Sequence, residues 1–143
     1  MTAAAARRTV RLKGRMSEPH VLLLEDDPAL LSVLLELFMD ERIDVTVCRS
    51  LADIYAALER DPYGVIVTDS WAHTRFDLGR QEQETLLALD ALAAVVFTTG
   101  RRWAQADPPL TLGTVTVLNK PYDVDELMFA VRAGAREREV AHV

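Results

Sequence analysis

The sequence alternates between two hydrophobic patterns, and the order of that alternation restricts the fold more than any other feature of the chain. Three short runs are continuously apolar, which is typical of strands buried on both faces of a sheet: residues 21–25, 65–69 and 94–99. Strict alternation of apolar and polar residues at 43–48 predicts a half-exposed edge strand, and a fifth strand is predicted at 114–119.

The segments between these strands carry apolar residues at helical spacing. The predicted helices cover residues 28–41, 50–60, 84–92 and 123–139. Capping chemistry marks two of their first turns, because Ser50 precedes Asp53 by three residues and Asp123 precedes Glu126 by three. Residues 70–83 show no clear period and are predicted to form a loop.

Strand and helix therefore alternate along the whole chain. Parallel strands joined by right-handed crossovers place helices on both faces of one sheet. We therefore predict an α/β fold with a doubly wound, five-stranded parallel sheet, formed by one domain at residues 18–139. Ligands of such sheets bind outside the carboxyl ends of the strands, so the residues at those ends are the candidates for function.

Polar groups end or directly follow four of the five predicted strands. They are Glu25-Asp26-Asp27, Asp69, Thr98-Thr99 and Asn119-Lys120-Pro121. The first group needs an explanation, because two like charges about 4 Å apart repel by about 4 kcal/mol at an effective dielectric of about 20. Water can screen such a cluster, or a cation can neutralise it. We interpret it as a cation site whose repulsion the metal relieves.

The distribution of charge along the chain restricts the kind of macromolecule that it can bind. The net charge of −6 divides into +5 in residues 1–15 and −11 in the remaining residues. We predict that residues 1–17 form a disordered basic arm and that residues 140–143 form a C-terminal tail. The acidic body does not suit nucleic-acid phosphates, so direct DNA binding is not expected.

Cysteine usage and hydropathy indicate a cytoplasmic protein. The single cysteine, Cys48, excludes an internal disulfide, fits a reducing compartment and lies among alternating apolar residues that predict a buried thiol. No apolar run approaches the roughly 18 residues needed to span a bilayer, so no membrane association is expected. The first 15 residues lack the apolar core of a secretory signal.

Four segments, "VLLLEDDP", "VIVTD", "VVFTTG" and "LNKPYD", resemble the receiver domain of two-component response regulators in order and approximate spacing. The resemblance covers about residues 19–135. A single segment of this kind is a weak signal, whereas four at the matching strand ends are specific. The resemblance implies the (βα)5 flavodoxin-like receiver fold.

The resemblance also implies a magnesium site. Asp26, Asp69 and the backbone carbonyl of Trp71 would bind Mg²⁺, a hard cation that prefers oxygen ligands, and Glu25 would act through a bound water. Asp27 is interpreted instead as a solvated residue or as the cap of the following helix.

In the same way, the resemblance assigns the phosphoryl chemistry. Asp69 would attack a phosphohistidine and become an aspartyl phosphate, while Mg²⁺ and Lys120 would hold two phosphoryl oxygens and Thr99 the third. The Lys120–Pro121 peptide bond would be cis. Thr98 is interpreted as a structural strand residue, and His73, in the loop after Asp69, as a solvated histidine.

Three features depart from the receiver pattern. Val117 stands where the family usually has an aromatic residue, and it is too small to act as a rotating switch. The segment "SWAHTRFDLGRQ" after Asp69 is longer and more polar than the usual short motif. Pro108-Pro109 would shorten the helix that belongs to the usual signalling face.

These observations lead to one main hypothesis for the function. The chain is interpreted as a single-domain receiver that accepts a phosphoryl group from a sensor histidine kinase or a histidine phosphotransfer protein. It would relay that group or regulate a downstream protein, with homodimerisation left open. It would be a signalling protein rather than an enzyme, catalysing only its own phosphorylation and dephosphorylation.

Two alternatives stay open. The first is a pseudo-receiver, an interaction module that keeps the acidic pocket and signals without phosphorylation, as Val117 and the altered loop suggest. The second is a Mg²⁺-dependent phosphatase that forms an aspartyl phosphate. That class uses an Asp-x-Asp pair after the first strand, whereas here the candidate nucleophile follows the third strand.

Overall fold

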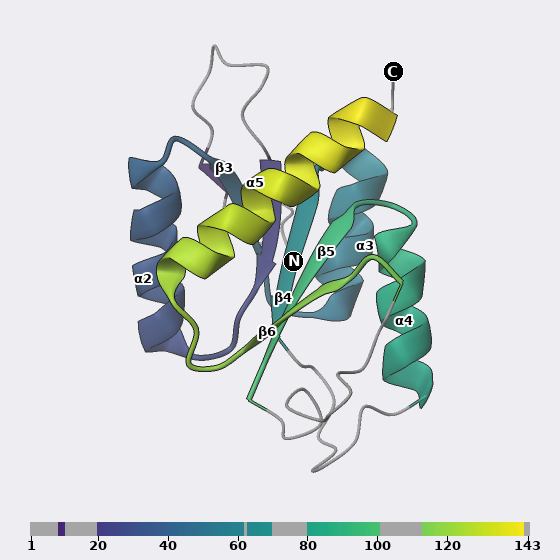
Figure 1. Cartoon of the computed structure of the whole chain (residues 1–143), viewed down its shortest axis with the longest axis horizontal. Helices are drawn as coiled ribbons and strands as arrows, with labels where there is room; N and C mark the ends of the chain where they lie inside the picture. The colour runs from purple at the N-terminus through teal and green to yellow at the C-terminus, as the bar shows by residue number, and fades with distance from the viewer. Residues whose placement is uncertain (1–8, 11–19, 62, 70–79, 101–112, 142–143) are drawn as a thin grey trace.

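The computed structural model describes residues 9–10, 20–61, 63–69, 80–100 and 113–141. Six strands form one sheet: β1 (Thr9–Val10), β2 (His20–Leu24), β3 (Asp44–Cys48), β4 (Val65–Asp69), β5 (Ala94–Thr99) and β6 (Thr116–Asn119). Within these described ranges, four helices connect or follow the strands: α2 (Pro28–Asp40), α3 (Leu51–Arg60), α4 (Arg80–Asp90) and α5 (Val124–Ala141). The strand order is β1-β3-β2-β4-β5-β6, and the strands from β2 to β6 are all parallel. The predicted doubly wound parallel sheet is therefore confirmed (Figure 1).

The sheet has one strand more than predicted. β1 pairs antiparallel with β3, so β3 is not the outermost strand and the prediction of an edge strand at 43–48 is wrong over this short pairing. Thr9 and Val10 are both β-branched and favour a strand, so they can extend an open sheet edge. Two residues are too few to show a hydrophobic pattern in the sequence. The other residues of the predicted basic arm lie outside the described residues.

Alternate residues of the central strands face opposite layers of helices. Val21 and Leu23 of β2 belong to a buried cluster with Phe38 of α2 and Val131 of α5. Leu22 and Leu24 belong to a second cluster with residues of α3 and α4. Helices α2 and α5 therefore cover one face and α3 and α4 the other, and Figure 1 shows α5 crossing in front of the sheet. Burial of both strand faces explains the continuous apolar runs.

Two elements begin two or more residues away from their predicted starts. Helix α4 begins at Arg80, four residues before the predicted start, because Arg, Gln and Glu favour helix without providing an apolar period. Strand β6 begins at Thr116 rather than at 114. The Thr114 hydroxyl and backbone N–H both donate to Oδ2 of Asp90, the last residue of α4, which holds Thr114 in the turn before β6.

The predicted caps are confirmed. Asp27 caps α2 by accepting hydrogen bonds from the backbone N–H groups of the first turn, and Pro28 occupies that turn. Ser50 caps α3, and Asp123 forms the capping box of α5 with Glu126. Within the described part of the chain, no helix combines the length and the apolar character that a membrane crossing requires.

Candidate functional site

Three carboxylates gather at the carboxyl ends of the two central strands. Glu25 and Asp26 follow β2, and Asp69 is the last residue of β4. Because Leu24 of β2 pairs with Thr68 of β4, the residues that follow them emerge side by side. Glu25, Asp26 and Asp69 each offer an oxygen, and these oxygens lie within 4.8 Å of one another.

Lys120 reaches this cluster from β6, two strands away from β4. Its ammonium Nζ lies 3.1 Å from Oδ1 of Asp69 and 3.1 Å from Oε1 of Glu25. The Lys120 backbone N–H donates to the carbonyl of Thr99, and the Lys120–Pro121 peptide bond is cis as predicted. The structure thus brings the candidate ammonium directly to the candidate nucleophile.

Glu25 is the most buried member of the cluster, with a side chain only 1% exposed. Its Oε2 accepts hydrogen bonds from Nζ of Lys120 and from the backbone N–H of Asp27, both at 3.1 Å. A buried carboxyl group needs such partners to satisfy its oxygens. The direct pairing of Glu25 with Lys120 was not predicted, since the sequence pattern suggested only a water-mediated role near the metal.

The electrostatics of the cluster favour a bound cation. Burial raises the pKa of Asp69 to about 7, with further increases from the Asp26 hydrogen bond and the Glu25 charge and an opposing effect of Lys120. The hydrogen bond to Asp69 lowers the pKa of Asp26. Of these two adjacent acids, Asp69 therefore keeps a proton to higher pH than Asp26 does when no cation is bound.

The Lys120 ammonium remains charged in this setting. Burial acts to lower its pKa, but the hydrogen bonds and negative charges of Glu25 and Asp69 outweigh that effect and raise it. One ammonium against three carboxylates leaves the cluster negative whenever all of them are ionised. The site can thus bind a small hard cation, which would place a second cationic group beside Asp69 in addition to the Lys120 ammonium.

The two threonines of β5 have different surroundings. Thr98 pairs across the sheet with Asp69, and its hydroxyl donates to the Thr68 carbonyl at 3.5 Å, in keeping with a structural role. Thr99 ends β5 fully buried beside Asn119 of β6. Trp71 and His73 lie outside the described residues.

The sequence reasoning missed Tyr122 as a neighbour of the site. Burial, followed by the charges of Glu25 and Asp69, raises the pKa of Tyr122 to about 12. Its hydroxyl oxygen is buried and has no hydrogen-bond partner among the described residues. The signal that could have found it is its position, two residues after Lys120 on the same turn.

Solved structures of receiver domains share this architecture. A response regulator receiver protein from Sinorhizobium medicae is 22% identical with a TM-score of 0.65, covering 87% of this chain and 99% of its own. The receiver domain of a Francisella response regulator is 24% identical with a TM-score of 0.66, covering 85% and 99%. This chain has the fold of a receiver domain.

A third receiver structure concerns the metal. The receiver domain of a sensor histidine kinase from Pseudomonas aeruginosa, described with a magnesium ion coordinated in the active site cleft, is 18% identical. Its TM-score is 0.62, and the match covers 82% of this chain and 98% of that one. No model of a protein family and no curated protein matches this sequence. At these identities the receiver fold is what the proteins share.

Proposed function

We propose that this chain is a phosphoacceptor receiver in which Asp69 takes a phosphoryl group from a phosphohistidine of a sensor histidine kinase or phosphotransfer protein. The observation that carries the proposal is the position of Asp69 between two electrostatic partners. The Lys120 ammonium lies 3.1 Å from its carboxylate, and the Asp26 carboxylate belongs to the same oxygen cluster. A phosphoryl group on Asp69 would be neutralised from both sides.

The donor set fits magnesium. Carboxylate oxygens from Asp26 and Asp69 are the ligands that Mg²⁺ prefers, and the raised pKa of Asp69 beside two other acids supports a site that a cation would stabilise. Trp71 would add its backbone carbonyl, and Glu25 would contribute through water while it continues to orient Lys120. When bound, the metal neutralises charge on the phosphoryl oxygens and keeps Asp69 deprotonated.

The transfer itself needs positioning more than proton chemistry. An ionised oxygen of Asp69 attacks phosphorus in line, the O–P bond forms, and the P–N bond to the donor histidine breaks with its electron pair going to the imidazole. The Lys120 ammonium, which pairs with the Asp69 carboxylate before transfer, would pair with a phosphoryl oxygen after transfer. The Thr99 hydroxyl is assigned to a third phosphoryl oxygen from its place at the end of β5.

The readout would differ from that of a receiver with an aromatic switch. Val117, in β6, is a partly buried valine that packs against the cluster beneath α3 and α4. It has one rotatable side-chain bond and no ring to move. A phosphorylation signal would therefore pass to a downstream protein through the loops around Asp69 rather than through residue 117.

Intact-mass spectrometry after exposure to acetyl phosphate and Mg²⁺ tests the proposal. The wild type should gain one phosphoryl group that hydroxylamine removes, and Asp69→Asn should gain none. Asp27→Asn is the matched control, because it changes an adjacent acid that caps α2 without belonging to the cluster. A wild type that gains no phosphoryl group would favour a pseudo-receiver. Val117 and the direct Glu25–Lys120 pair are the features that suggest this alternative.

Further assays separate the remaining classes. Repeated turnover of a phosphomonoester would instead indicate a phosphatase, whereas a receiver should hydrolyse only its own aspartyl phosphate.

The buried Cys48 thiol, whose pKa burial raises to about 12, suits the proposed cytoplasmic setting because it is neither exposed nor activated. Transfer from candidate kinases would identify the donor.

A further inference from the structure

Tyr122 carries a hydroxyl group that the folded chain leaves without a partner. Its oxygen is buried, and within the part of the chain that the structure describes it makes no hydrogen bond. Such a hydroxyl lowers stability, because it has given up its hydrogen bonds to water without replacing them. A phenylalanine would fill the same space without that cost, so packing alone does not account for the hydroxyl.

Tyr122 lies on the same side of the sheet as two acids of the candidate site. Its ring packs against the cluster beneath α2 and α5, which contains Leu23 of β2 and Val67 of β4. Glu25 and Asp69 follow those two residues by two positions, and residues two apart along a strand point to the same face. Burial, followed by the charges of Glu25 and Asp69, raises the pKa of Tyr122 to about 12, so the hydroxyl keeps its proton at neutral pH and can donate it.

Glu25 is the acid that depends on a donor. Its side chain is 1% exposed, and its Oε2 accepts hydrogen bonds from Nζ of Lys120 and from the backbone N–H of Asp27. The same ammonium lies 3.1 Å from Oδ1 of Asp69 and, in the proposed function, pairs with a phosphoryl oxygen after transfer. As the ammonium moves toward the phosphoryl group, its contact with Glu25 lengthens, and an acid shut off from water loses its charged partner.

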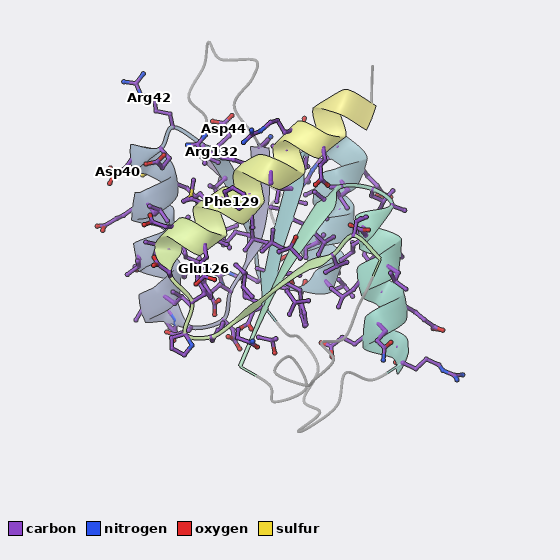
Figure 2. All side chains as sticks on the ribbon, in the orientation of Figure 1. Asp40, Arg42, Asp44, Glu126, Phe129 and Arg132 are labelled. Carbon is purple, nitrogen blue, oxygen red and sulfur yellow. The ribbon has the colours of Figure 1, made fainter. Side chains whose placement is uncertain are left out.

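The acids at the start of α5 have no such need. Figure 2 shows Glu126 near the beginning of this helix, four residues after Tyr122 in the sequence. Glu126 is exposed to water, and its Oε1 already accepts a hydrogen bond from the backbone N–H of Asp123. Glu25 is therefore the acceptor that a buried hydroxyl on this turn can serve.

We propose that the Tyr122 hydroxyl is a reserve donor for Glu25, which donates a hydrogen bond to this acid when Lys120 turns to a phosphoryl oxygen. Tyr122 is then a positioning residue, because it contacts neither the phosphorus nor the metal and acts by making the ammonium easier to release from Glu25. The hydroxyl lowers stability before transfer and gains its hydrogen bond in the transition state. The role in transfer rests on the proposed function, whereas the exchange of donors at Glu25 can be tested on the unmodified chain.

Urea denaturation without metal or phosphoryl donor tests the exchange of donors. Tyr122→Phe should raise the urea midpoint of the wild type, in which the hydroxyl has no partner among the described residues. In a Lys120→Met background the same change should lower the midpoint, because the hydroxyl now serves Glu25. With Glu25→Leu added to Lys120→Met the acceptor is gone, and Tyr122→Phe should raise the midpoint again. An effect of the same sign in all three backgrounds would overturn the proposal.

The rate of labelling by acetyl phosphate and Mg²⁺ tests the role in transfer. Tyr122→Phe should slow labelling about tenfold, the factor that one hydrogen bond to a charged group can supply. The half-life of the aspartyl phosphate should stay the same, since Lys120 is turned to the phosphoryl group both before and during hydrolysis. A residue with a purely structural role would not separate these two rates. Tyr55→Phe is the matched control, because it removes the hydroxyl of a tyrosine that is 38% exposed on α3 and should change neither rate.

The two proposals fail in different ways. A wild type that gains no phosphoryl group overturns the proposed function, and the sign of the Tyr122→Phe effect in urea then decides the exchange of donors by itself. A labelled wild type together with an unchanged labelling rate in Tyr122→Phe overturns the role of the hydroxyl in transfer and leaves the phosphoacceptor function in place.

Discussion

Oδ1 of Asp69 and Nζ of Lys120 lie 3.1 Å apart, although one residue ends β4 and the other follows β6, with β5 between the two strands. The parallel sheet makes this contact geometrically available, because the carboxyl ends of all five parallel strands share one rim. Glu25 holds the same ammonium from the other side at 3.1 Å. Lys120 is thus both part of the candidate site and the counter-charge of a buried acid.

The first prediction follows from that double role. Lys120→Met removes the partner of Glu25, whose side chain is 1% exposed, and should lower the free energy of unfolding by about 2–3 kcal/mol. The expected loss is below that of a fully buried pair, because the Lys120 side chain is 23% exposed. Urea denaturation without metal measures it. Adding Glu25→Gln should recover most of the loss, and a double variant as unstable as the single one would contradict the prediction.

The contact between Glu25 and Lys120 also shows where sequence reasoning stops. An apolar run ending in an acid was enough to predict β4 and the position of Asp69 at its end. A strand that is buried on both faces needs apolar residues at successive positions, and this pattern is visible in the sequence. Pairing between side chains 95 residues apart depends on rotamers that no local pattern encodes. The family resemblance named the residues, but not that Glu25 would take the ammonium directly.

The start of α4 and the pairing of β1 were missed for a different reason. Residues 80–83 form helix through intrinsic preference, without the apolar spacing on which the prediction relied. Thr9 and Val10 extend the sheet through backbone hydrogen bonding, which any compatible residues could provide. Both elements carry too little hydrophobic signal to be read from a single sequence.

The second prediction concerns pH in the absence of metal. The pKa of Asp69 is about 7 in the folded chain against 3.8 ordinarily, so the folded state binds more protons between these values. Stability must therefore fall as pH rises through this window and level off above about pH 7. Asp26 does not reverse the slope there, because its pKa is lowered below 3.8.

Melting temperatures in EDTA at about pH 5 and about pH 8 measure this effect, which should amount to about 2 kcal/mol. Asp69→Asn should remove most of the slope, because an amide does not titrate. A wild type that is more stable at the higher pH than at the lower one would show that Asp69 is ionised throughout.

The third prediction concerns Mg²⁺. Millimolar Mg²⁺ should raise the melting temperature at neutral pH, equivalent to about 1–2 kcal/mol if its concentration is about 10 to 30 times the dissociation constant. Asp26→Asn should raise the metal-free melting temperature by removing one of the repelling acids, and should abolish the response to Mg²⁺. Asp27→Asn should keep the response. A wild-type midpoint indifferent to Mg²⁺ would argue against a cation site.

The fourth prediction concerns the hydroxyl of Tyr122. This oxygen is buried without a hydrogen-bond partner among the described residues, while the ring packs against the cluster beneath α2 and α5. A buried polar group without a partner costs about 1–3 kcal/mol, so Tyr122→Phe should raise the free energy of unfolding by about 1 kcal/mol. Tyr122→Leu should lower it, because the smaller side chain fills the space less well. If urea denaturation instead shows that Tyr122→Phe is destabilising by 1 kcal/mol or more, the hydroxyl contributes a hydrogen bond, and the prediction is wrong.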